Sequence, residues 1–330
     1  MKPVETAFTK LLGIEVPVIC GAMFPCSNVE LVAAVSEAGG IGIVQPISLV
    51  YVYGEDFRAG LRRIRSLTTK PIGMNVLVEK SSKVYENRMR GWVDIALEEG
   101  VRFFVTALGN PSWVVARTEQ CGGTVFHNIT EEKWAIRALD YGVHGLNCVN
   151  DRAGGHAGVR SAEELLSSLK NKYPQTPLIC AGGVGDETAF VRALQLGYDG
   201  VQMGTRFIAT TECGSHVTYK EAIVHAKEED IVLTDRVTGI PLSVIRTPYV
   251  QEIGTRAGPF ARFLLRNERT KHLMRLFYTL QSGWKLKRSS LRGLSSKDYW
   301  QAGKSVAGVN QIESAHAIVR RFAEAATRAF

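Results

Sequence analysis

One histidine of this chain stands in a setting that suits proton transfer. His156 lies in the run AGGHAG at 153–158, which holds three glycines. Glycine gives the backbone access to conformations that other residues avoid, so the imidazole can be aimed away from the loop. With an ordinary pKa of about 6.5, a histidine takes up and releases protons near neutral pH. We therefore take His156 as the candidate catalytic residue, against the alternative of an exposed loop histidine without a role.

Two glycine-bearing turns have the composition of a phosphate site. The tripeptide AGG occupies 181–183 and MGT occupies 203–205, and each ends an apolar run. Turns without bulky side chains leave backbone N–H groups free to surround a phosphate, and the positive end of a following helix adds to the attraction. Glycine also marks ordinary tight turns, so the prediction of a phosphate site depends on the two turns occurring together.

Two polar residues end other apolar runs. Asn75 in GMNV carries an amide that can donate and accept at once, which suits a polar heterocycle, although a strand-end turn residue is the simpler explanation. His127 could face the same side of the molecule or lie in the core. The chain has no phosphate-binding loop of the Walker type, no GxSxG turn, no HExxH motif and no dinucleotide-binding fingerprint.

The elements that must position these residues repeat along the first two-thirds of the chain. Eight continuous apolar runs are typical of parallel strands covered on both faces, and amphipathic segments separate them. The runs lie at 17–23, 40–46, 71–78, 103–109, 124–129, 145–150, 177–184 and 200–207, and the segments at 28–38, 57–66, 85–99, 112–120, 131–140, 161–169 and 187–196. Eight similar units favour an α/β fold of the (β/α)8 TIM-barrel type over a doubly wound sheet, and such a barrel carries its functional groups at the C-terminal strand ends.

The pattern changes after the eighth run. We expect a barrel domain at 1–214, a mostly helical insertion at 215–300 that covers the barrel mouth, and a C-terminal helix within 301–330 that completes the barrel. Helix-like stretches lie at 219–227, 258–280 and about 308–330. Between 256 and 292, ten basic residues stand against Glu268, a net charge of +9, whereas the whole chain carries +8. This stretch could be a solvated helical face or a landing surface for an acidic carrier protein.

Composition excludes several classes of protein. The chain has 330 residues, 45% of them hydrophobic, and no apolar stretch long enough to span a membrane or serve as a secretory signal. Its six cysteines are scattered without CxxC pairs or zinc spacing, which indicates reduced thiols, no metal site and a cytoplasmic location. No motif for nucleic-acid binding accompanies the positive charge.

An ordered set of motifs resembles one known family. CGAM (20–23), SEAGGIG (36–42), PIGMN (71–75), AGGHAG (153–158), AGGV (181–184) and GVQMGTRF (200–207) resemble the nitronate monooxygenases, formerly called 2-nitropropane dioxygenases. Flavin-dependent enoyl-ACP reductases of type II and NADH:quinone reductases are close relatives on the same barrel. The resemblance implies a TIM barrel that binds FMN, with His156 as the base or as the group that stabilises an anionic substrate. It further implies cofactor contacts from Ala22, Met23, Asn75, Asn128, Gly155, Ala181, Gly182, Gly183, Gly204 and Thr205.

The resemblance leaves the reaction open between related chemistries. A nitronate monooxygenase would oxidise an alkyl nitronate with O2 to a carbonyl compound and nitrite. The alternative is an NAD(P)H-dependent FMN reductase that acts on enoyl thioesters or quinones, and a barrel that binds flavin or an anion without catalysis is a third possibility. The small-molecule substrate, the choice of NADH or NADPH and a possible homodimer are not fixed by the motifs.

Three positions depart from the pattern that the resemblance implies. Asn128 stands where some relatives carry a lysine, Arg152 where relatives often place an acid, and Lys304 where the family has glutamine in AGQ. Together with the basic insertion, these changes favour an anionic or carrier-linked substrate.

Overall fold

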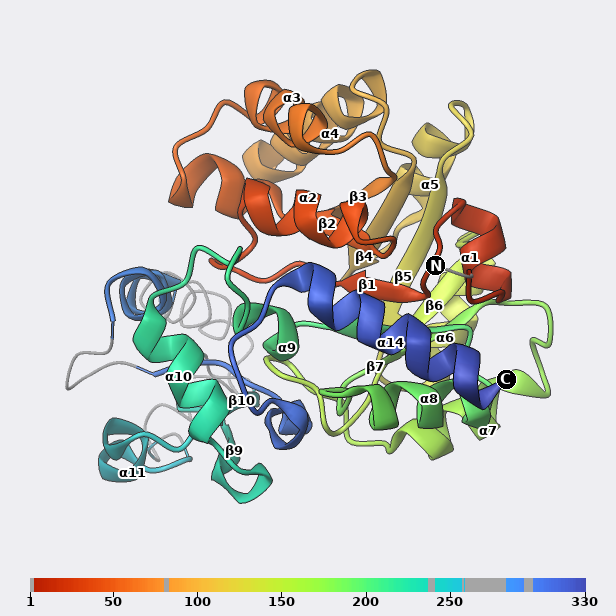
Figure 1. Ribbon diagram of the computed structural model, residues 1–330. Helices are drawn as coiled ribbons and strands as arrows, with labels where there is room; N and C mark the ends of the chain where they lie inside the picture. The colour runs from red at the N-terminus through yellow and green to blue at the C-terminus, as the bar shows by residue number, and fades with distance from the viewer. Residues whose placement is uncertain (1–2, 80–82, 237–240, 257, 259–282, 294–298) are drawn as a thin grey trace.

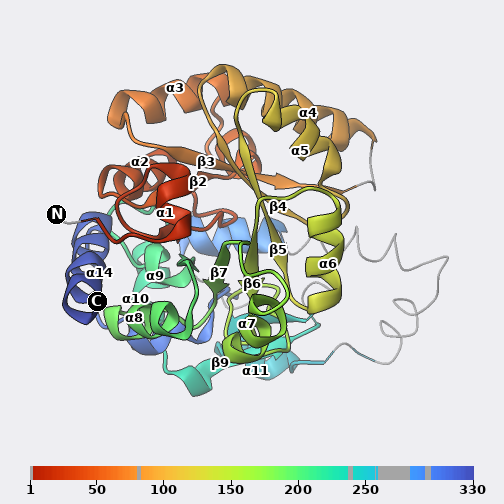
Figure 2. The same ribbon diagram turned by 90° about the vertical axis from the view of Figure 1, so that its right-hand side faces the viewer.

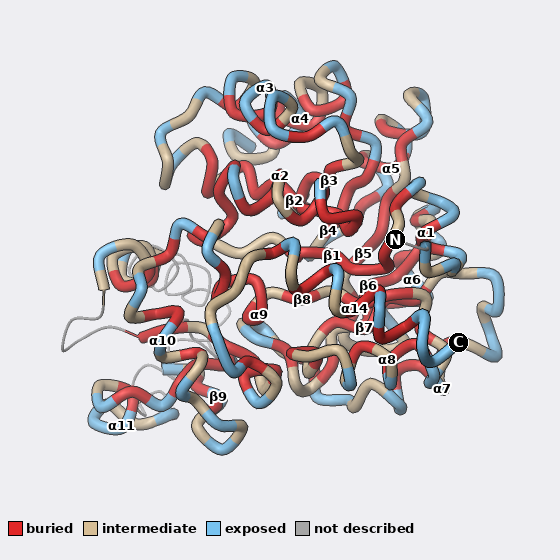
Figure 3. Tube along the Cα trace, in the orientation of Figure 1, coloured by how far each residue is buried: buried red, intermediate tan, exposed pale blue. Residues whose placement is uncertain are grey.

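The structure is a computed structural model that describes residues 3–79, 83–236, 241–256, 258, 283–293 and 299–330. Eight parallel strands pair in chain order and close into a barrel, since β1 pairs with both β2 and β8. Helices surround the barrel, with their buried faces toward the strands and their exposed faces toward solvent (Figures 1, 2 and 3). The predicted (β/α)8 TIM barrel is therefore confirmed.

The barrel strands and their helices follow the predicted order closely. The strands are β1 (Val18–Cys20), β2 (Ile41–Val44), β3 (Ile72–Leu77), β4 (Phe103–Ala107), β5 (Thr124–Ile129), β6 (Gly145–Val149), β7 (Leu178–Ala181) and β8 (Gly200–Met203). The helices between them are α2 (Val29–Glu37), α3 (Phe57–Leu67), α4 (Lys83–Glu98), α5 (Ser112–Glu119), α6 (Glu132–Asp140), α7 (Ala162–Lys170) and α8 (Glu187–Leu196), with a short π-helix, η1 (Ser48–Val52), before α3.

The N-terminal helix closes one end of the barrel. Helix α1 (Ala7–Leu12) places Phe8 against Phe103 and Phe126, with ring centroids 5.9 and 5.6 Å away, and all three rings are buried. These rings belong to a small apolar cluster that also contains Ile19, Ile43 and other residues that fill the barrel interior. Because this end is filled, only the opposite end, where the strands finish, can admit a ligand.

The described part of the insertion gathers on one side of the barrel, away from both chain termini (Figure 1). It contains α10 (Val217–His225), the 3-10 helix η2 (Glu228–Asp230), α11 (Pro248–Ile253) and a helix at 283–292, whereas the short α9 (Thr205–Ile208) follows β8 within the barrel domain. It also contains an antiparallel pair, β9 (Ile231–Thr234) and β10 (Leu242–Ile245), which the sequence analysis did not predict. The predicted helix at 258–280 and its charges Arg262, Arg266, Glu268, Arg269, Lys271 and Arg275 lie outside the described residues.

The chain returns to the barrel through two elements. The 3-10 helix η3 (Lys304–Gly308) is followed by α14 (Ala315–Ala329), which packs between α2 and α8. Helix α14 begins later than the predicted 308 because Ser314 caps it, its side chain accepting from the Ala317 N–H at 3.1 Å. Among the described helices, none is both long and apolar enough to cross a membrane.

Candidate functional site

A layer of polar side chains forms the floor of the open end of the barrel. Side chains alternate between the interior and the helices along each strand, so Asn128 points the same way as the interior Phe126. Asn147 pairs with Asn128 in register, and Gln202 pairs with Ala181. The layer therefore lies directly above the apolar plug and faces the mouth.

The floor is a hydrogen-bonded network with one atom left over. Asn147 donates through Nδ2 to Asn128 Oδ1 and to Gln202 Oε1, both at 2.9 Å, and its own Oδ1 is buried without a partner among the residues that the structure describes. Asn75 is also buried and donates through Nδ2 to the Val105 carbonyl at 3.1 Å. An orphaned buried acceptor costs free energy unless a ligand or water satisfies it. The floor is thus suited to a polar ring that carries N–H groups.

The ends of β7 and β8 lie side by side and form the predicted phosphate corner. Gly182 and Gly183 have φ of +121° and +79°, a region that favours glycine, and a Cβ on Gly182 would lie 2.3 Å from Asn150 Oδ1. Across the described residues, the backbone N–H groups of Gly182, Gly183 and Gly204 have no acceptor. Unpaired N–H groups clustered at a loop are the donors that an anion needs.

Thr205 and Met23 adjoin this corner. The Gly303 N–H donates to Thr205 Oγ1 at 3.0 Å, which fixes the hydroxyl and leaves its hydrogen without an acceptor in the part of the chain that the structure describes. A Cβ on Gly204 would lie 3.3 Å from Met23 Sδ, so the turn after β1 reaches the same corner. Ala22, beside Met23, is partly buried against the barrel interior.

The start of α8 already carries a negative charge, which opposes the predicted attraction of a phosphate to this helix end. Asp186 caps this helix, because its Oδ1 accepts from the Ala189 N–H at 2.8 Å. The carboxylate already satisfies a first-turn donor and places a negative charge at the helix start. At this corner the turn N–H groups and nearby cations are the donors that α8 does not supply.

The loop after β6 is held in place by the segment that leaves the insertion. Gly154 and Gly303 touch so closely that a Cβ on Gly303 would stand 2.5 Å from the Gly154 nitrogen. The Gly155 carbonyl accepts from Ser243 N of β10 at 2.8 Å, and Gly155 itself has φ of +71°. These contacts hold the backbone of Gly154 and Gly155 in place, and they therefore set the position of the next residue, His156.

The two histidines near the strand ends have different environments. The His156 side chain is exposed and, in the described residues, makes no hydrogen bond, while desolvation by the protein around it lowers its pKa below the ordinary value. His127 is buried, and its Nδ1 lies 2.7 Å from Thr106 Oγ1. It alternates with the interior-facing Phe126 and Asn128, so it points toward the helices. His156 is the accessible histidine of the pair, and His127 belongs to the core.

Two of the three departures from the family pattern meet at one carboxylate. Arg152 forms a bidentate pair with Glu228 of η2, with Nη1–Oε1 at 2.8 Å and Nη2–Oε2 at 2.6 Å. Lys304 Nζ lies 3.7 Å from Glu228 Oε1. The hydrogen bonds from Arg152 hold the pKa of Glu228 below its usual value, so this carboxylate is ionised at neutral pH.

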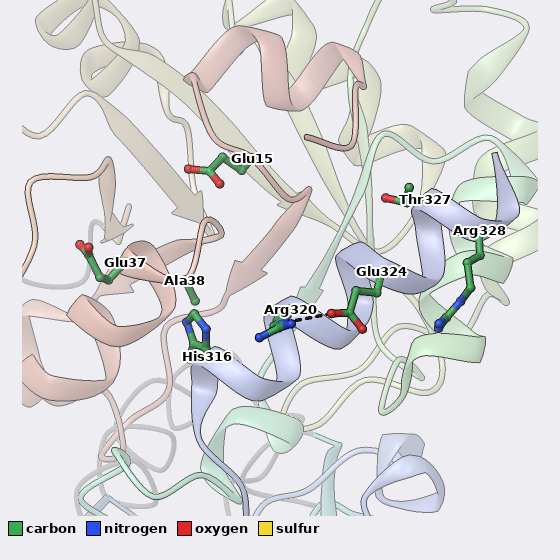
Figure 4. A pocket seen from close by; sticks show the side chains of 8 residues that line it. All are labelled: Glu15, Glu37, Ala38, His316, Arg320, Glu324, Thr327 and Arg328. Carbon is green, nitrogen blue, oxygen red and sulfur yellow. Dashed lines mark hydrogen bonds and ion pairs between the residues drawn. The ribbon is translucent and has the colours of Figure 1, made fainter. Parts of the chain in front are cut away.

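A separate groove of about 600 Å³ lies on the side of the barrel (Figure 4). Glu15 precedes β1 and Glu37 ends α2, so the groove reaches toward the closed end rather than the mouth. Three of its charges have partners, since Lys70 lies 2.8 Å from Glu15 and Arg320 lies 2.8 Å from Glu324. The groove takes no part in the site.

The strand ends bring most of the predicted residues to one mouth, and the structure adds others. Asn75, Asn128 and Ala181 belong to the floor, whereas Gly182, Gly183, Gly204, Thr205 and Met23 form the corner. The roles of Asn147, Gln202 and Glu228 were not predicted from the sequence. The first two carried a usable signal, because a polar residue inside the buried runs GLNCV and GVQMG has to face a partner. The pairing of Glu228 with residues 76 positions apart had no such signal.

Comparison with known proteins places the chain in one group. A model of the nitronate monooxygenase family matches residues 5–324. The chain is 31% identical to the (3aS,4S,5R,7aS)-5-hydroxy-7a-methyl-1-oxo-octahydro-1H-indene-4-carboxyl-CoA dehydrogenase of Mycobacterium tuberculosis, covering 79% of this chain and 72% of that one. It is 29% identical to the nitronate monooxygenase of Pseudomonas aeruginosa, covering 70% and 77%. The structure resembles that of FabK from Thermotoga maritima, with a TM-score of 0.81, 27% identity and coverage of 98% and 97%.

Proposed function

Because the chain belongs to the nitronate monooxygenase family, we propose that it is an FMN-dependent nitronate monooxygenase. Family membership makes it an oxidoreductase that acts on a small molecule. The proposed reaction converts an alkyl nitronate and O2 to a carbonyl compound and nitrite. The proposal rests on the arrangement of the mouth. N–H groups without an acceptor among the described residues lie beside a polar floor, and His156 is exposed in the loop after β6.

The residues of the mouth fit FMN at both ends of the molecule. The N–H groups of Gly182, Gly183 and Gly204 and the hydroxyl of Thr205 would hold the phosphate, as donors without a protein acceptor. The floor would face the flavin ring through Asn75, Asn128 and Gln202, with Ala22 and Met23 at its side. Asn147 Oδ1, buried and unpaired, is the acceptor that a ring N–H or a water between them would satisfy.

The redox chemistry would come from FMN, which takes electrons from the substrate and passes them to O2. The protein supplies binding, orientation and proton control. His156 lies in a loop fixed by Gly303 and Ser243, and its lowered pKa keeps the imidazole neutral at pH 7. A neutral imidazole accepts a proton from the carbon of a nitroalkane through one nitrogen, or donates a hydrogen bond to a nitronate oxygen through the other.

The proposal is tested by the flavin content and the electron donor. Purified protein should be yellow and release FMN on denaturation. A nitronate should bleach that flavin without NAD(P)H under anaerobic conditions, and turnover in air should release nitrite. Protein that fails to take up FMN would contradict the whole proposal.

A second function is favoured by one relative. The Mycobacterium tuberculosis protein is named a dehydrogenase of a carboxyl-CoA, that is, of a thioester. An NAD(P)H-dependent FMN reductase that acts on enoyl thioesters or quinones would share the same barrel and phosphate corner. It would be distinguished by rapid anaerobic reduction of the flavin by NADH or NADPH and by slow reaction with nitronates.

The proposal also includes a cytoplasmic location for the protein and two kinds of partner. All six cysteines are free thiols, which suits the reducing cytoplasm. A homodimer and an acidic carrier protein stay predictions. Six of the eleven charged residues behind the carrier prediction lie outside the part of the chain described by the structure.

A further inference from the structure

A cation that the proposed function has not used lies against the phosphate corner. A Cβ on Gly183 would stand 2.8 Å from Arg152 Nε and 3.0 Å from Arg152 Cδ, so the arginine side chain runs directly over this glycine. Gly183 is also one of the residues whose N–H has no acceptor among those the structure describes. A fixed positive charge and an unpaired backbone donor therefore adjoin each other.

Glu228 binds the two terminal nitrogens of Arg152 and leaves the Nε–H without an acceptor from this carboxylate. The bidentate pair uses both terminal nitrogens of the guanidinium, at 2.8 and 2.6 Å. The Nε–H, on the side of Gly183, has no acceptor within the described ranges. The fork uses two of the five N–H groups of the guanidinium, and because the group is planar it fixes the direction of the others, the Nε–H among them.

The local charge stays positive despite the carboxylate. Lys304 lies 3.7 Å from the same Glu228, and its backbone N–H donates to the Arg152 carbonyl at 3.0 Å. Two cations thus share one anion, so the group formed by Arg152, Lys304 and Glu228 carries a net charge of +1. Arg152 does not lose its proton in a protein, and the pKa of Glu228 is lowered, so this charge is constant around neutral pH.

We propose that Arg152, held by Glu228, is a binding residue for the terminal phosphate of the flavin cofactor and makes the site select FMN over riboflavin. The inference rests on the proposed function, because it requires FMN in the mouth. A phosphate monoester carries between one and two negative charges at neutral pH, and riboflavin, which is otherwise the same molecule, carries none. Arg152 would therefore add affinity for one flavin and none for the other.

The test compares two flavins on three proteins. Full-length chain freed of flavin is titrated with FMN and, separately, with riboflavin, and binding is followed by quenching of flavin fluorescence. For Arg152→Gln we expect the Kd for FMN to rise about three- to tenfold, the range for a partly exposed charge contact, while the Kd for riboflavin stays the same. The matched control is Arg160→Gln, which removes the same charge from an exposed position of the same loop and should change neither Kd.

Each outcome bears on the inference. An equal rise of both dissociation constants in Arg152→Gln would mean that the loop has lost its shape, and this would overturn the inference, as would an unchanged Kd for FMN. If Arg152→Gln fails to fold, Arg152→Lys serves instead, because it keeps the charge but loses the fork to Glu228. Its ratio of riboflavin Kd to FMN Kd should then fall below that of wild type, and an unchanged ratio would contradict the inference.

The failure of this inference can be told from the failure of the proposed function. Wild-type protein that binds neither flavin would contradict the FMN site itself. Wild-type protein that binds FMN tightly, with the same flavin preference in Arg152→Gln, would overturn only the role of Arg152.

Discussion

At the scale of single residues, two histidines near the strand ends have different environments, His127 because of the strand alternation and His156 because it lies beyond a strand end. His127 follows Phe126 on β5 and so points away from the barrel interior, where Thr106 is its partner. His156 lies beyond a strand end, in a loop whose glycines are pinned by Gly303 and Ser243. The sequence predicted His156 as the reactive one because glycines surround it. The direction of the His127 side chain could not be predicted, because it depends on the register of β5 and no neighbouring residue type indicates that register.

Replacement of His156 should separate proton transfer from flavin binding. In His156→Asn, we expect turnover of a neutral nitroalkane, which needs its C–H proton removed, to fall about 100-fold or more. Turnover of the preformed nitronate should fall less, and the Kd for FMN should not change. Steady-state rates with both substrates check this. Equal losses with the two substrates would contradict a proton-accepting role.

The pH dependence of the same step follows from the lowered pKa of His156. The neutral form is the proton acceptor, and desolvation makes this form persist below the ordinary pKa of a histidine. The midpoint of the acid-side decline in nitroalkane turnover should therefore lie below the ordinary histidine pKa of about 6.5. A profile of kcat/KM against pH measures this, and a decline centred above that value would be contrary to the structure.

His127 should make the fold sensitive to acid. Burial lowers its pKa to about 4, while in the unfolded chain the group binds a proton below about 6.5. Between these values the unfolded state binds more protons, so the free energy of unfolding falls as the pH falls, by about 3 kcal/mol in total. Urea unfolding at several pH values should show this loss in wild type and less of it in His127→Gln. The control His225→Gln replaces an exposed histidine and should keep the wild-type dependence.

At the scale of elements, the site depends on packing between segments far apart in the chain. Gly154 of the loop after β6 contacts Gly303, and Gly185 of the β7–α8 turn contacts η3, where a Cβ would lie 2.0 Å from the Ser305 carbonyl. The repeat of apolar runs was enough to predict the barrel, because parallel strands need buried faces. The close contacts between loops could not be predicted, since they depend on where the insertion returns.

Substitution of glycine should show which of these contacts matters. Gly303→Ala forces a Cβ to 2.5 Å from the Gly154 backbone, so we expect lower stability, by about 1–3 kcal/mol, and weaker binding of FMN. Gly91→Ala is the matched control. It lies within α4, where nothing stands within 4 Å of the new Cβ, and it should stabilise the protein by up to about 1 kcal/mol. Guanidinium unfolding of both variants gives the comparison, and a Gly303→Ala protein as stable as wild type would refute the tight contact.

At the scale of the whole molecule, the barrel is closed at one end and functional at the other. The plug of Phe8, Phe103 and Phe126 makes the closed end a source of stability only. Ser243 of β10 and Ser305 of η3 contact the loops at the other end, at Gly155 and Gly185, where we place the proposed site. The order of the elements predicted the barrel, whereas the β9–β10 pair was not predicted.

If the two ends of the barrel are independent, a substitution at the closed end should lower stability and leave flavin binding unchanged. Phe8→Ala removes a buried ring and should cost about 3–5 kcal/mol, whereas Leu11→Ala on the exposed side of the same helix should cost little. Chemical unfolding measures the cost, and flavin titration under native conditions should give the wild-type Kd for FMN in both variants. Weaker FMN binding in Phe8→Ala would show that the two ends are coupled.

The central claim is that this mouth holds FMN and transfers electrons to it from a nitronate. Anaerobic stopped-flow mixing of the flavin-loaded protein with propionate-3-nitronate, with NADH and with NADPH, while the flavin absorbance is recorded, tests it most directly. We expect rapid bleaching by the nitronate and slow or no bleaching by either nicotinamide. Rapid bleaching by NADH or NADPH, with an unchanged flavin in the presence of the nitronate, would contradict it.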